Sequence, residues 1–501
     1  MTDPAAPLPA APLPRVTTAA PDASGRADAV VIGLHQSGAG ATLAAGAGPL
    51  ADALGDRLAA ALDALDAEGR PGEVLKIPTL GLADAPLLVA TGLGPAPADG
   101  TQIDAETARR AVGAALRVLT GRRRVHVAID APAGALAEGA LFGAYSYPAY
   151  KSAPPKRALR TVTVSAPASA RADVRRAAVL GEAVAVCRDL VNTPPNDLFP
   201  ESFAARAAAL AGARDLDVEV LDERALKRGG YGGVRGVGQG SSRPPRLVRI
   251  SYRPKRARGH LAFVGKGVTF DSGGLNLKPG SSMLWMKSDM GGAAAAICAV
   301  VALAELRVPV AVTVTTPMVE NLPSATSYRP SDILTLKNGT TVEVGNTDAE
   351  GRLILADAIT RAAEDEPDRL IELSTLTGAQ VVALGDRVIG AMGSDGWRDE
   401  VVAAANAAGE AAWAMPLPAE LRAGLDSPVA DLVNVATEGG AGMLVAGHFL
   451  ASFVPDGLPW AHLDIAGPSY NNGSPRDYTP KGGTGAGVRT LVSAAERFAG
   501  R

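Results

Sequence analysis

Residues 261–306 read LAFVGKGVTFDSGGLNLKPGSSMLWMKSDMGGAAAAICAVVALAEL, and this stretch indicates the fold class. It begins with a short apolar run at 261–264 that is typical of a buried strand. A glycine-rich polar connection follows, and 292–306 is the most apolar helical pattern in the chain. The next β-branched run, at 310–314, completes a strand–helix–strand unit. Such units predict a sheet of mostly parallel strands with helices packed on it.

The same alternation extends in both directions from this stretch. Further strands are predicted near residue 218 and at 247–250, 370–373, 388–391 and 461–465. Closer to the N-terminus, strands at 29–32, 87–90 and 125–129 alternate with helical patterns at 50–65, 105–119 and 135–147. We therefore expect an α/β protein of two α/β domains. The smaller one is N-terminal, and the larger C-terminal one has a mixed, mostly parallel central sheet flanked by helices.

Breaks in the pattern suggest the domain boundaries. Residues 1–25 are rich in proline and alanine, and we predict a disordered extension there. An N-terminal α/β domain is expected over 26–165, because the segment KSAPPKRALR at 151–160 interrupts the alternation. The helical pattern at 172–191 is stopped by paired prolines, so we expect a linking helix within 166–195. The larger C-terminal domain then occupies 196–501.

Composition limits the possible partners and location. The 501 residues are 47% hydrophobic and 20% charged, and 49 Lys+Arg against 52 Asp+Glu give a formal net charge of -3. This balance disfavours a nucleic-acid partner. No uninterrupted apolar stretch is long enough for a membrane span, so no membrane association is expected. Two cysteines are too few for a disulfide framework, which indicates a reducing, cytoplasmic location.

Charged residues gather around the predicted strand ends and helix starts between 261 and 355. In the segment 348–352, charged residues alternate at a spacing of two, which in an extended chain points them to one side. Four carboxylates brought together would repel one another unless cations neutralise them, and two divalent metal ions would supply that charge. Oxygen-dominated ligands suit Mg, Mn or Zn. The residues concerned are Lys266, Asp271, Lys278, Asp289, Asp348, Glu350 and Arg352.

A purely structural interpretation of these residues is also open. Thr347 and Glu350 have the spacing of a capping box, and Asp289 could be the N-cap of the alanine-rich helix. A buried salt-bridge cluster would account for the interleaved cations, but it would be costly without a function. The five histidines are scattered, and His462 and Cys298 are predicted to be core residues.

Several motifs together resemble those of a known family. They are VGKGVTFDSGG at 264–274, MKSDMGGAA at 286–294 and, most specifically, NTDAEGRL at 346–353. The match continues through NTPPNDLFP at 192–200, STLTGA at 374–379, HLDIAG at 462–467 and PKGGTGAGVRTL at 480–491. In order and spacing these motifs resemble the leucyl aminopeptidase family, the cytosolic dinuclear metallo-aminopeptidases. The resemblance covers nearly all of the second domain.

The resemblance implies a function and a role for each residue. The protein would release N-terminal amino acids, leucine and similar ones preferred, from peptides, using a water activated by two metal ions, Zn or Mn. Lys278 would stabilise the oxyanion, and Arg352 would hold a bicarbonate ion as general base. The metal ligands would be Lys266, Asp271, Asp289, Asp348 and Glu350. Met286, Thr375, Gly378 and Ala466 would line the substrate pocket.

The family analogy also implies a homohexamer, with peptides as its substrates. Around Leu284 and Trp285 the family usually has a polar or acidic residue, so the side-chain preference is open here. Three other functions remain: a dipeptidase, a two-metal phosphoesterase, and a nucleic-acid-binding regulator. The last is supported only by the basic runs at 122–124 and 253–258, which are more simply solvated loops.

Overall fold

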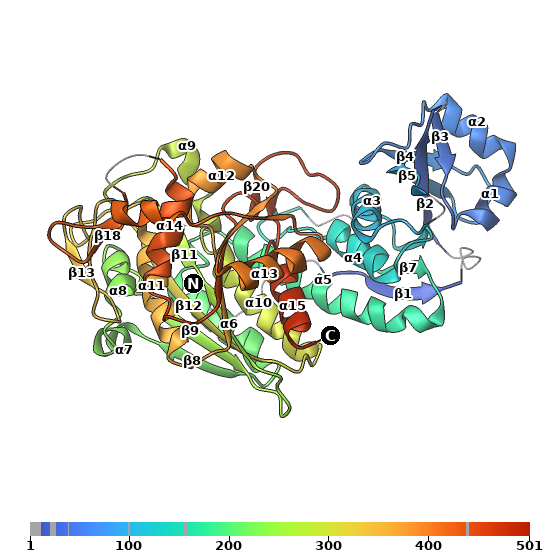
Figure 1. The fold of residues 1–501 in the computed structure, drawn as a ribbon. Coiled ribbons are helices and arrows are strands. Elements are labelled where there is room, and N and C mark those ends of the chain that lie inside the picture. Colours follow the sequence, from blue (N-terminus) through green and yellow to red (C-terminus); the bar gives the residue numbers. More distant parts are fainter. Residues whose placement is uncertain are drawn as a thin grey trace. The chain divides into compact units, whose positions relative to one another are not determined.

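The computed structural model describes residues 12–20, 27–38, 40–98, 101–153, 159–436 and 440–500, and the chain divides into two compact units (Figure 1). The N-terminal unit comprises Pro9–Ala185 and Asn472–Lys481, and the C-terminal unit comprises Val186–Asn471 and Gly482–Arg501. The division falls within helix α5 (Arg171–Asn192), where the sequence predicts a helix. Both units are α/β, as predicted.

A seven-stranded sheet forms the centre of the N-terminal unit, in the order β1-β7-β6-β2-β5-β4 with β3 paired to β2. Five neighbouring strands are parallel, whereas β4 and β3 run antiparallel to their partners. The central strand is apolar along most of its length because both of its faces are covered. The strands are β1 (Arg15–Ala19), β2 (Ala29–Ser37), β3 (Gly40–Leu43), β4 (Val74–Pro78), β5 (Leu87–Pro95), β6 (Arg124–Ala128) and β7 (Thr161–Ser165).

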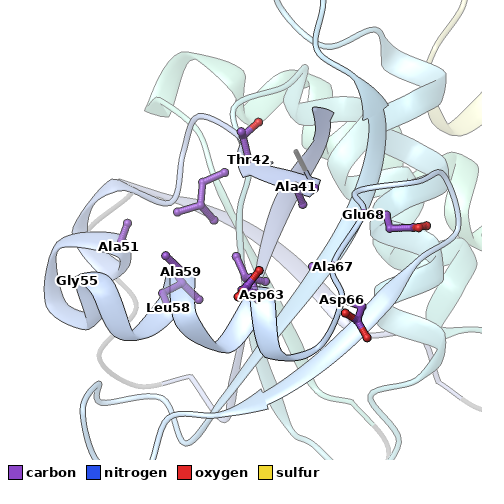
Figure 2. A pocket seen from close by; sticks show the side chains of 13 residues that line it. Ala41, Thr42, Ala51, Gly55, Leu58, Ala59, Asp63, Asp66, Ala67 and Glu68 are labelled. Carbon is purple, nitrogen blue, oxygen red and sulfur yellow. The ribbon is translucent and has the colours of Figure 1, made fainter. Parts of the chain in front are cut away.

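Helices cover both faces of this sheet. Helices α3 (Ala105–Arg117) and α4 (Ala133–Ala144) pack on one face together with the start of α5. Helices α1 (Gly48–Leu54) and α2 (Asp56–Ala64) pack on the other. A hollow of about 680 Å³ lies between α2 and β3. Figure 2 labels Leu58, Asp63 and Asp66 among the residues that line it.

Two predictions for this unit need correction. Within residues 1–25, predicted to be a disordered extension, Arg15–Ala19 instead forms β1. Its β-branched residues lie between Pro14 and Pro21, free of proline, and pair in parallel with β7. Residues 1–11 and 21–26 lie outside the described residues. The single helix predicted over 50–65 is two helices, since Gly55 takes a positive φ of 52° between them.

The C-terminal unit is built on a nine-stranded sheet in the order β17-β16-β19-β15-β10-β12-β9-β8, with β11 paired to β12. Its middle strands β19, β15, β10 and β12 are parallel, and the antiparallel pairs lie toward the edges. The strands are β8 (Asp217–Leu221), β9 (Arg246–Tyr252), β10 (His260–Gly265), β11 (Gly267–Asp271), β12 (Ala311–Asn321), β15 (Arg369–Ser374), β16 (Ile389–Gly393), β17 (Ala412–Ala414) and β19 (Trp460–Asp464).

Helices enclose this sheet on both sides (Figure 1). One core cluster joins α8, α11 and α14 to the sheet, while α6, α10, α13 and α15 pack on the opposite side. These helices are α6 (Pro200–Gly212), α8 (Gly232–Gly238), α10 (Gly291–Glu305), α11 (Glu350–Ala363), α13 (Asp395–Ala407), α14 (Gly442–Ala451) and α15 (Val488–Phe498). The mixed, mostly parallel sheet flanked by helices confirms the predicted architecture.

Shorter elements complete the unit. Helices α7 (Glu223–Arg228), α9 (Gly280–Met283) and α12 (Gly378–Leu384) lie in connections, as do the 3-10 turns at Met286–Ser288 and Ala419–Leu425. Two small sheets contain β13 (Ile333–Thr335), β14 (Thr341–Glu343) and β18 (Leu432–Val433), and β20 (Tyr470–Asn471) with β21 (Gly482–Gly483). By length and composition Met286–Glu305 could span a membrane, but 83% of that window is buried inside the protein, as expected of a core helix.

Close packing between α10 and the sheet depends on a glycine. A Cβ at Gly292 would lie 2.0 Å from the Leu373 carbonyl oxygen, which is backbone and cannot move aside. We expect Gly292→Ala to lower the free energy of unfolding by about 2 kcal/mol through overpacking. Gly396→Ala, in a helix where nothing lies within 4 Å of the added Cβ, is the matched control. Chemical denaturation distinguishes them, and equal stability of both variants would contradict this packing.

A buried ion pair between neighbouring strands makes stability depend on pH. His462 Nδ1 contacts Glu372 Oε2, and both side chains are fully buried. Burial alone would lower the pKa of His462, but the Glu372 carboxylate raises it above its ordinary value of 6.5. The stabilisation is therefore complete below pH 6.5 and is lost as pH rises through the raised pKa.

Glu372→Gln should lower the free energy of unfolding by about 3 kcal/mol at pH 6, since one partner of a buried pair is removed. The deficit relative to the unchanged protein should shrink as pH rises, in denaturation curves measured from pH 6 to 9. Asp395→Asn, which removes an exposed carboxylate, is the control. A loss of unfolding free energy in Glu372→Gln that grows with pH would contradict the raised pKa of His462.

Candidate metal and catalytic site

The candidate site lies where parallel strands of the larger sheet end. Lys266 follows β10 directly, Asp271 is the last residue of β11, and Thr375 follows β15. Because β10, β15, β12 and β11 run in one direction, their carboxyl ends meet at the same edge of the sheet. Residues far apart in the sequence therefore meet here.

Lys266 links two of the predicted acidic residues. Its side chain is almost fully buried, and its Nζ lies 2.8 Å from Asp289 Oδ2 and 2.7 Å from Glu350 Oε1. The same amine donates a hydrogen bond to the Thr375 carbonyl oxygen at 3.2 Å. Lys266 thus connects the chain before α10 to the start of α11.

Lys278 links the other two predicted acidic residues, Asp271 and Asp348. Its Nζ lies 2.8 Å from Asp271 Oδ2 and 2.5 Å from Asp348 Oδ1. The loop between Asp271 and Lys278 turns back sharply at Gly273 and Gly274, which both have positive φ, and the Lys278 N–H donates to the Ser272 carbonyl at 2.9 Å. The turn therefore brings the Lys278 side chain back to the carboxylate of Asp271, the residue at which the loop begins.

Two interpretations of the segment 347–352 are wrong. Glu350 is the first residue of α11 and Arg352 lies in its first turn, so the residues do not alternate along an extended chain. The N-cap of α11 is Ala349, with no side-chain capping bond, and the Thr347 hydroxyl instead donates to the Gly273 carbonyl at 2.7 Å. A carboxylate in the first turn of a helix is favoured by the helix dipole.

Asp289 does not act as a helix cap either. The N-cap of α10 is Met290, while Asp289 Oδ1 accepts a hydrogen bond from the Thr375 hydroxyl at 2.7 Å. Its second oxygen faces Lys266. Both oxygens of Asp289 therefore point toward groups from other strand ends.

The carboxylates can approach one ion together. One oxygen from each of Asp271, Asp348 and Glu350 lies within 4.8 Å of the others. Asp289 Oδ2, Asp348 Oδ1 and Glu350 Oε1 lie at ion-pair distance from a lysine, yet no donor among the described residues meets them with hydrogen-bond geometry. Acceptors left without directed donors in a buried site suit a cation.

Burial and crowding shift the pKa values here. Burial, reinforced by Glu350, raises the pKa of Asp271 to about 6, and burial also raises the pKa of Asp289. Burial alone would lower the pKa of Lys266, but the Asp289 and Glu350 carboxylates raise it above its ordinary value. Four carboxylates face two lysine ammonium groups, so the cluster holds more negative than positive charge.

Arg352 lies apart from the lysine pairs but close to the acidic cluster. Its side chain is buried, and its Nη1 donates to the Asn434 carbonyl at 2.8 Å. Burial lowers the pKa of Arg352 to about 10, although Glu350 and Asp464 oppose this. Its Nε has no hydrogen-bond partner among the described residues. A buried guanidinium with an unused donor suits a small anion.

The four predicted pocket residues lie on segments next to the cluster. Met286 accepts a hydrogen bond from the Asp289 N–H at 3.4 Å, and Thr375 donates to the Asp289 carboxylate. Gly378 begins α12, with open space where a Cβ would lie. Ala466 follows β19, and its N–H donates to Asp464 at 3.2 Å.

Sequence reasoning missed the residues that orient the carboxylates. Asn321, at the carboxyl end of β12, donates to Asp271 Oδ1 at 2.9 Å and to the Thr347 carbonyl at 2.9 Å. The side-chain oxygen of Asn434 accepts a hydrogen bond from the Gly345 N–H at 2.7 Å, and its backbone carbonyl accepts one from Arg352 Nη1. The polar end of the apolar strand β12 could have indicated Asn321, but no pattern marked Asn434.

Comparison with known proteins identifies the family. Residues 185–492 match the model of the Cytosol aminopeptidase family, catalytic domain, and residues 19–154 match that of the Cytosol aminopeptidase family, N-terminal domain. A probable cytosol aminopeptidase of Streptomyces avermitilis is 50% identical over 492 residues, which cover 94% of this chain and 96% of the relative. One of Mycobacterium tuberculosis is 51% identical over 458 residues, 88% of each chain.

A solved structure is also similar along its whole length. The bottromycin maturation enzyme BotP is 38% identical with a TM-score of 0.82, and the match covers 95% of this chain and 100% of BotP. BotP in complex with Mn gives the same identity and TM-score, covering 94% of this chain. The chain therefore belongs to the cytosol aminopeptidase family.

Membership confirms the resemblance seen in the sequence and the class of enzyme. The protein is a metal-dependent aminopeptidase, a hydrolase that acts on peptides. This assignment removes the phosphoesterase hypothesis.

The position of the Lys266 amine depends on Gly351. A Cβ at Gly351 would lie 2.6 Å from Lys266 Cε and 2.7 Å from Nζ, so Gly351→Ala must push the amine away from Asp289 and Glu350. Because alanine suits a helix, the fold should remain, while turnover of a peptide substrate should fall on the order of 100-fold. Gly396→Ala is the control. Unchanged turnover in Gly351→Ala would show that catalysis does not depend on the position of the Lys266 amine.

Proposed function

We propose that this protein removes N-terminal amino acids, leucine and similar apolar residues preferred, from peptides by means of two divalent metal ions. The observation that carries the proposal is the acidic cluster, where four carboxylates gather at the strand ends against only two ammonium groups. A largely buried cluster with excess negative charge is stable when it binds cations.

The donors present fit two ions. We assign one ion to Lys266, Asp271, Asp289 and Glu350, and the other to Asp271, Asp348 and Glu350, so that two carboxylates are shared. The three acceptor oxygens without directed donors support this assignment. Carboxylates with one amine suit Zn or Mn, and Lys266 must release its proton to join them.

The protein's own side chains then have distinct tasks. When bound, the ions would lower the pKa of a water molecule, polarise the scissile carbonyl and hold the substrate's free amine. Lys278 would remain protonated, because Asp271 raises its pKa against the opposing effect of burial. Its ammonium group would stabilise negative charge on the carbonyl oxygen during attack.

Arg352 would hold a bicarbonate ion as the general base. Its buried guanidinium has an unused Nε donor, which suits a planar anion with two oxygens. Such an anion would accept the proton that the nucleophilic water loses. None of the five histidines is assigned this task, and His462 is paired with Glu372 in the sheet.

The pocket for the N-terminal side chain would be lined by Met286, Thr375, Gly378 and Ala466. The methionine and alanine provide apolar contact, and the open space at Gly378 leaves room for a branched side chain. Leucine and residues of similar size fit this description. We further propose that the enzyme acts in the cytoplasm as a homohexamer, by analogy with the family.

Hydrolysis of leucine 4-nitroanilide tests the proposal directly. The protein supplied with Mn or Zn should hydrolyse it, and a chelated, metal-stripped sample should lose essentially all activity until the metal is returned. Glu350→Gln removes a charge from both ion sites and should lower turnover on the order of 100-fold or more, together with metal content.

Glu343→Gln is the matched control, because this carboxylate lies on β14 and bonds Ser427 rather than the cluster. It should retain normal turnover and metal content. Full activity in the chelated sample, or normal turnover in Glu350→Gln, would reject the metal-dependent mechanism. Equal hydrolysis of leucine and aspartate substrates would reject the apolar preference alone.

A further inference from the structure

Asp464 is a buried carboxylate to which the mechanism assigns no task. It is the last residue of β19, is fully buried, and pairs in register with Ser374, the last residue of β15. Burying a carboxylate is unfavourable unless hydrogen bonds compensate for lost water. Its contacts therefore indicate what it does.

Asp464 joins the segment after β15 to the segment after β19. Its Oδ1 accepts hydrogen bonds from the Leu376 N–H at 3.1 Å and the Ala466 N–H at 3.2 Å. Its Oδ2 accepts one from the Thr377 hydroxyl at 2.7 Å. Three hydrogen bonds from two segments fix the carboxylate and, reciprocally, fix both segments.

Thr375 lies between two anchored neighbours. On one side Ser374 belongs to the sheet, and on the other Leu376 is held by Asp464. Thr375 itself contacts two of the proposed ligands: its carbonyl accepts from Lys266 Nζ at 3.2 Å, and its hydroxyl donates to Asp289 Oδ1 at 2.7 Å. Movement of Thr375 would displace both ligands on the same side of the cluster.

We propose that Asp464 is a positioning residue for the metal centre. By fixing the segment that carries Thr375, it holds Lys266 and Asp289 in the arrangement that binds an ion. This inference rests on the proposed function, in which those two residues are ligands of one ion and not of the other. It therefore predicts that loss of Asp464 weakens one of the two ion sites selectively.

The contacts of Asp464 suggest a matched pair of variants. Asp464→Ala removes all three hydrogen bonds. Asp464→Asn keeps them, because both backbone donors meet Oδ1, and the Thr377 hydroxyl can rotate to accept from the new amide. The asparagine variant removes the negative charge while preserving the anchor.

Isothermal titration of the metal-stripped full-length protein with Mn²⁺ is the first measurement. The unchanged protein should bind two ions. Asp464→Ala should bind one of them 10- to 100-fold more weakly, as expected when a residue that orients a ligand is lost, and the other with little change. Asp464→Asn should stay within about threefold of the unchanged protein at both sites.

Kinetics give a second measurement. At saturating Mn²⁺, Asp464→Ala should recover much of its kcat, whereas at limiting Mn²⁺ its turnover should fall in parallel with occupancy of the weakened site. A residue needed only for stability would lower the fraction of folded protein at every Mn²⁺ concentration. Thermal unfolding of the metal-stripped variants monitors this contribution.

If Asp464→Ala does not fold, Thr375→Val and Thr375→Ser carry the same test. Valine removes the hydroxyl that meets Asp289, and serine keeps it. Valine should weaken one ion site 10- to 100-fold, and serine should not.

Three results would overturn the inference. The first is normal affinity at both sites in Asp464→Ala, or in Thr375→Val where that variant is used. The second is an Asp464→Asn variant as weak as Asp464→Ala, which would assign the effect to charge near Arg352. The third is equal weakening of both sites. If the unchanged protein binds no ions, the proposed function itself fails, and that result is distinct from the other three.

Discussion

The imbalance of charge in the acidic cluster is the constraint on which the rest of the site depends. Two lysines each meet two carboxylates, and the separation of these pairs prevents either lysine from neutralising the whole cluster. A protein could remove such crowding by substituting apolar residues, often without loss of stability. Retaining the cluster at a buried edge of the sheet therefore indicates a role in binding cations, which the family assignment supports.

The parallel sheet makes this crowding possible. Strand ends at one edge lie close together, so each connecting segment can contribute a single polar residue without folding a long loop inward. Glycines then allow backbone to approach where a side chain would collide. Gly351 makes room for the Lys266 side chain, and Gly292 lets α10 lie against Leu373. The same small residues that make the core compact also determine where the site's amine lies.

The sequence was sufficient for the main alternation of strands and helices and for the motifs, because alternation and residue order are local properties. It was insufficient wherever long-range contacts determine local structure. Residues 348–352 have an extended-chain spacing, but Glu350 begins a helix. Asn434 shows no motif, since its importance arises only when its loop meets Arg352. Likewise β1 follows a proline-rich start and forms by pairing with β7, 146 residues away.

The orientation of the carboxylate oxygens distinguishes a cluster that binds cations from one in which the charges only repel one another. Asp271 uses Oδ1 to accept from the Gly273 N–H and Asn321, which leaves Oδ2 facing Lys278 and the other carboxylates. Asp289 likewise uses Oδ1 for Thr375 and directs Oδ2 inward. Asp271 and Asp289 thus each have one oxygen held by the scaffold and one turned toward the centre. Because the scaffold bonds fix the inward oxygens of Asp271 and Asp289, side-chain rotation cannot relieve the repulsion between them. Protonation relieves it at a raised pKa, and a bound cation relieves it while the carboxylates stay charged.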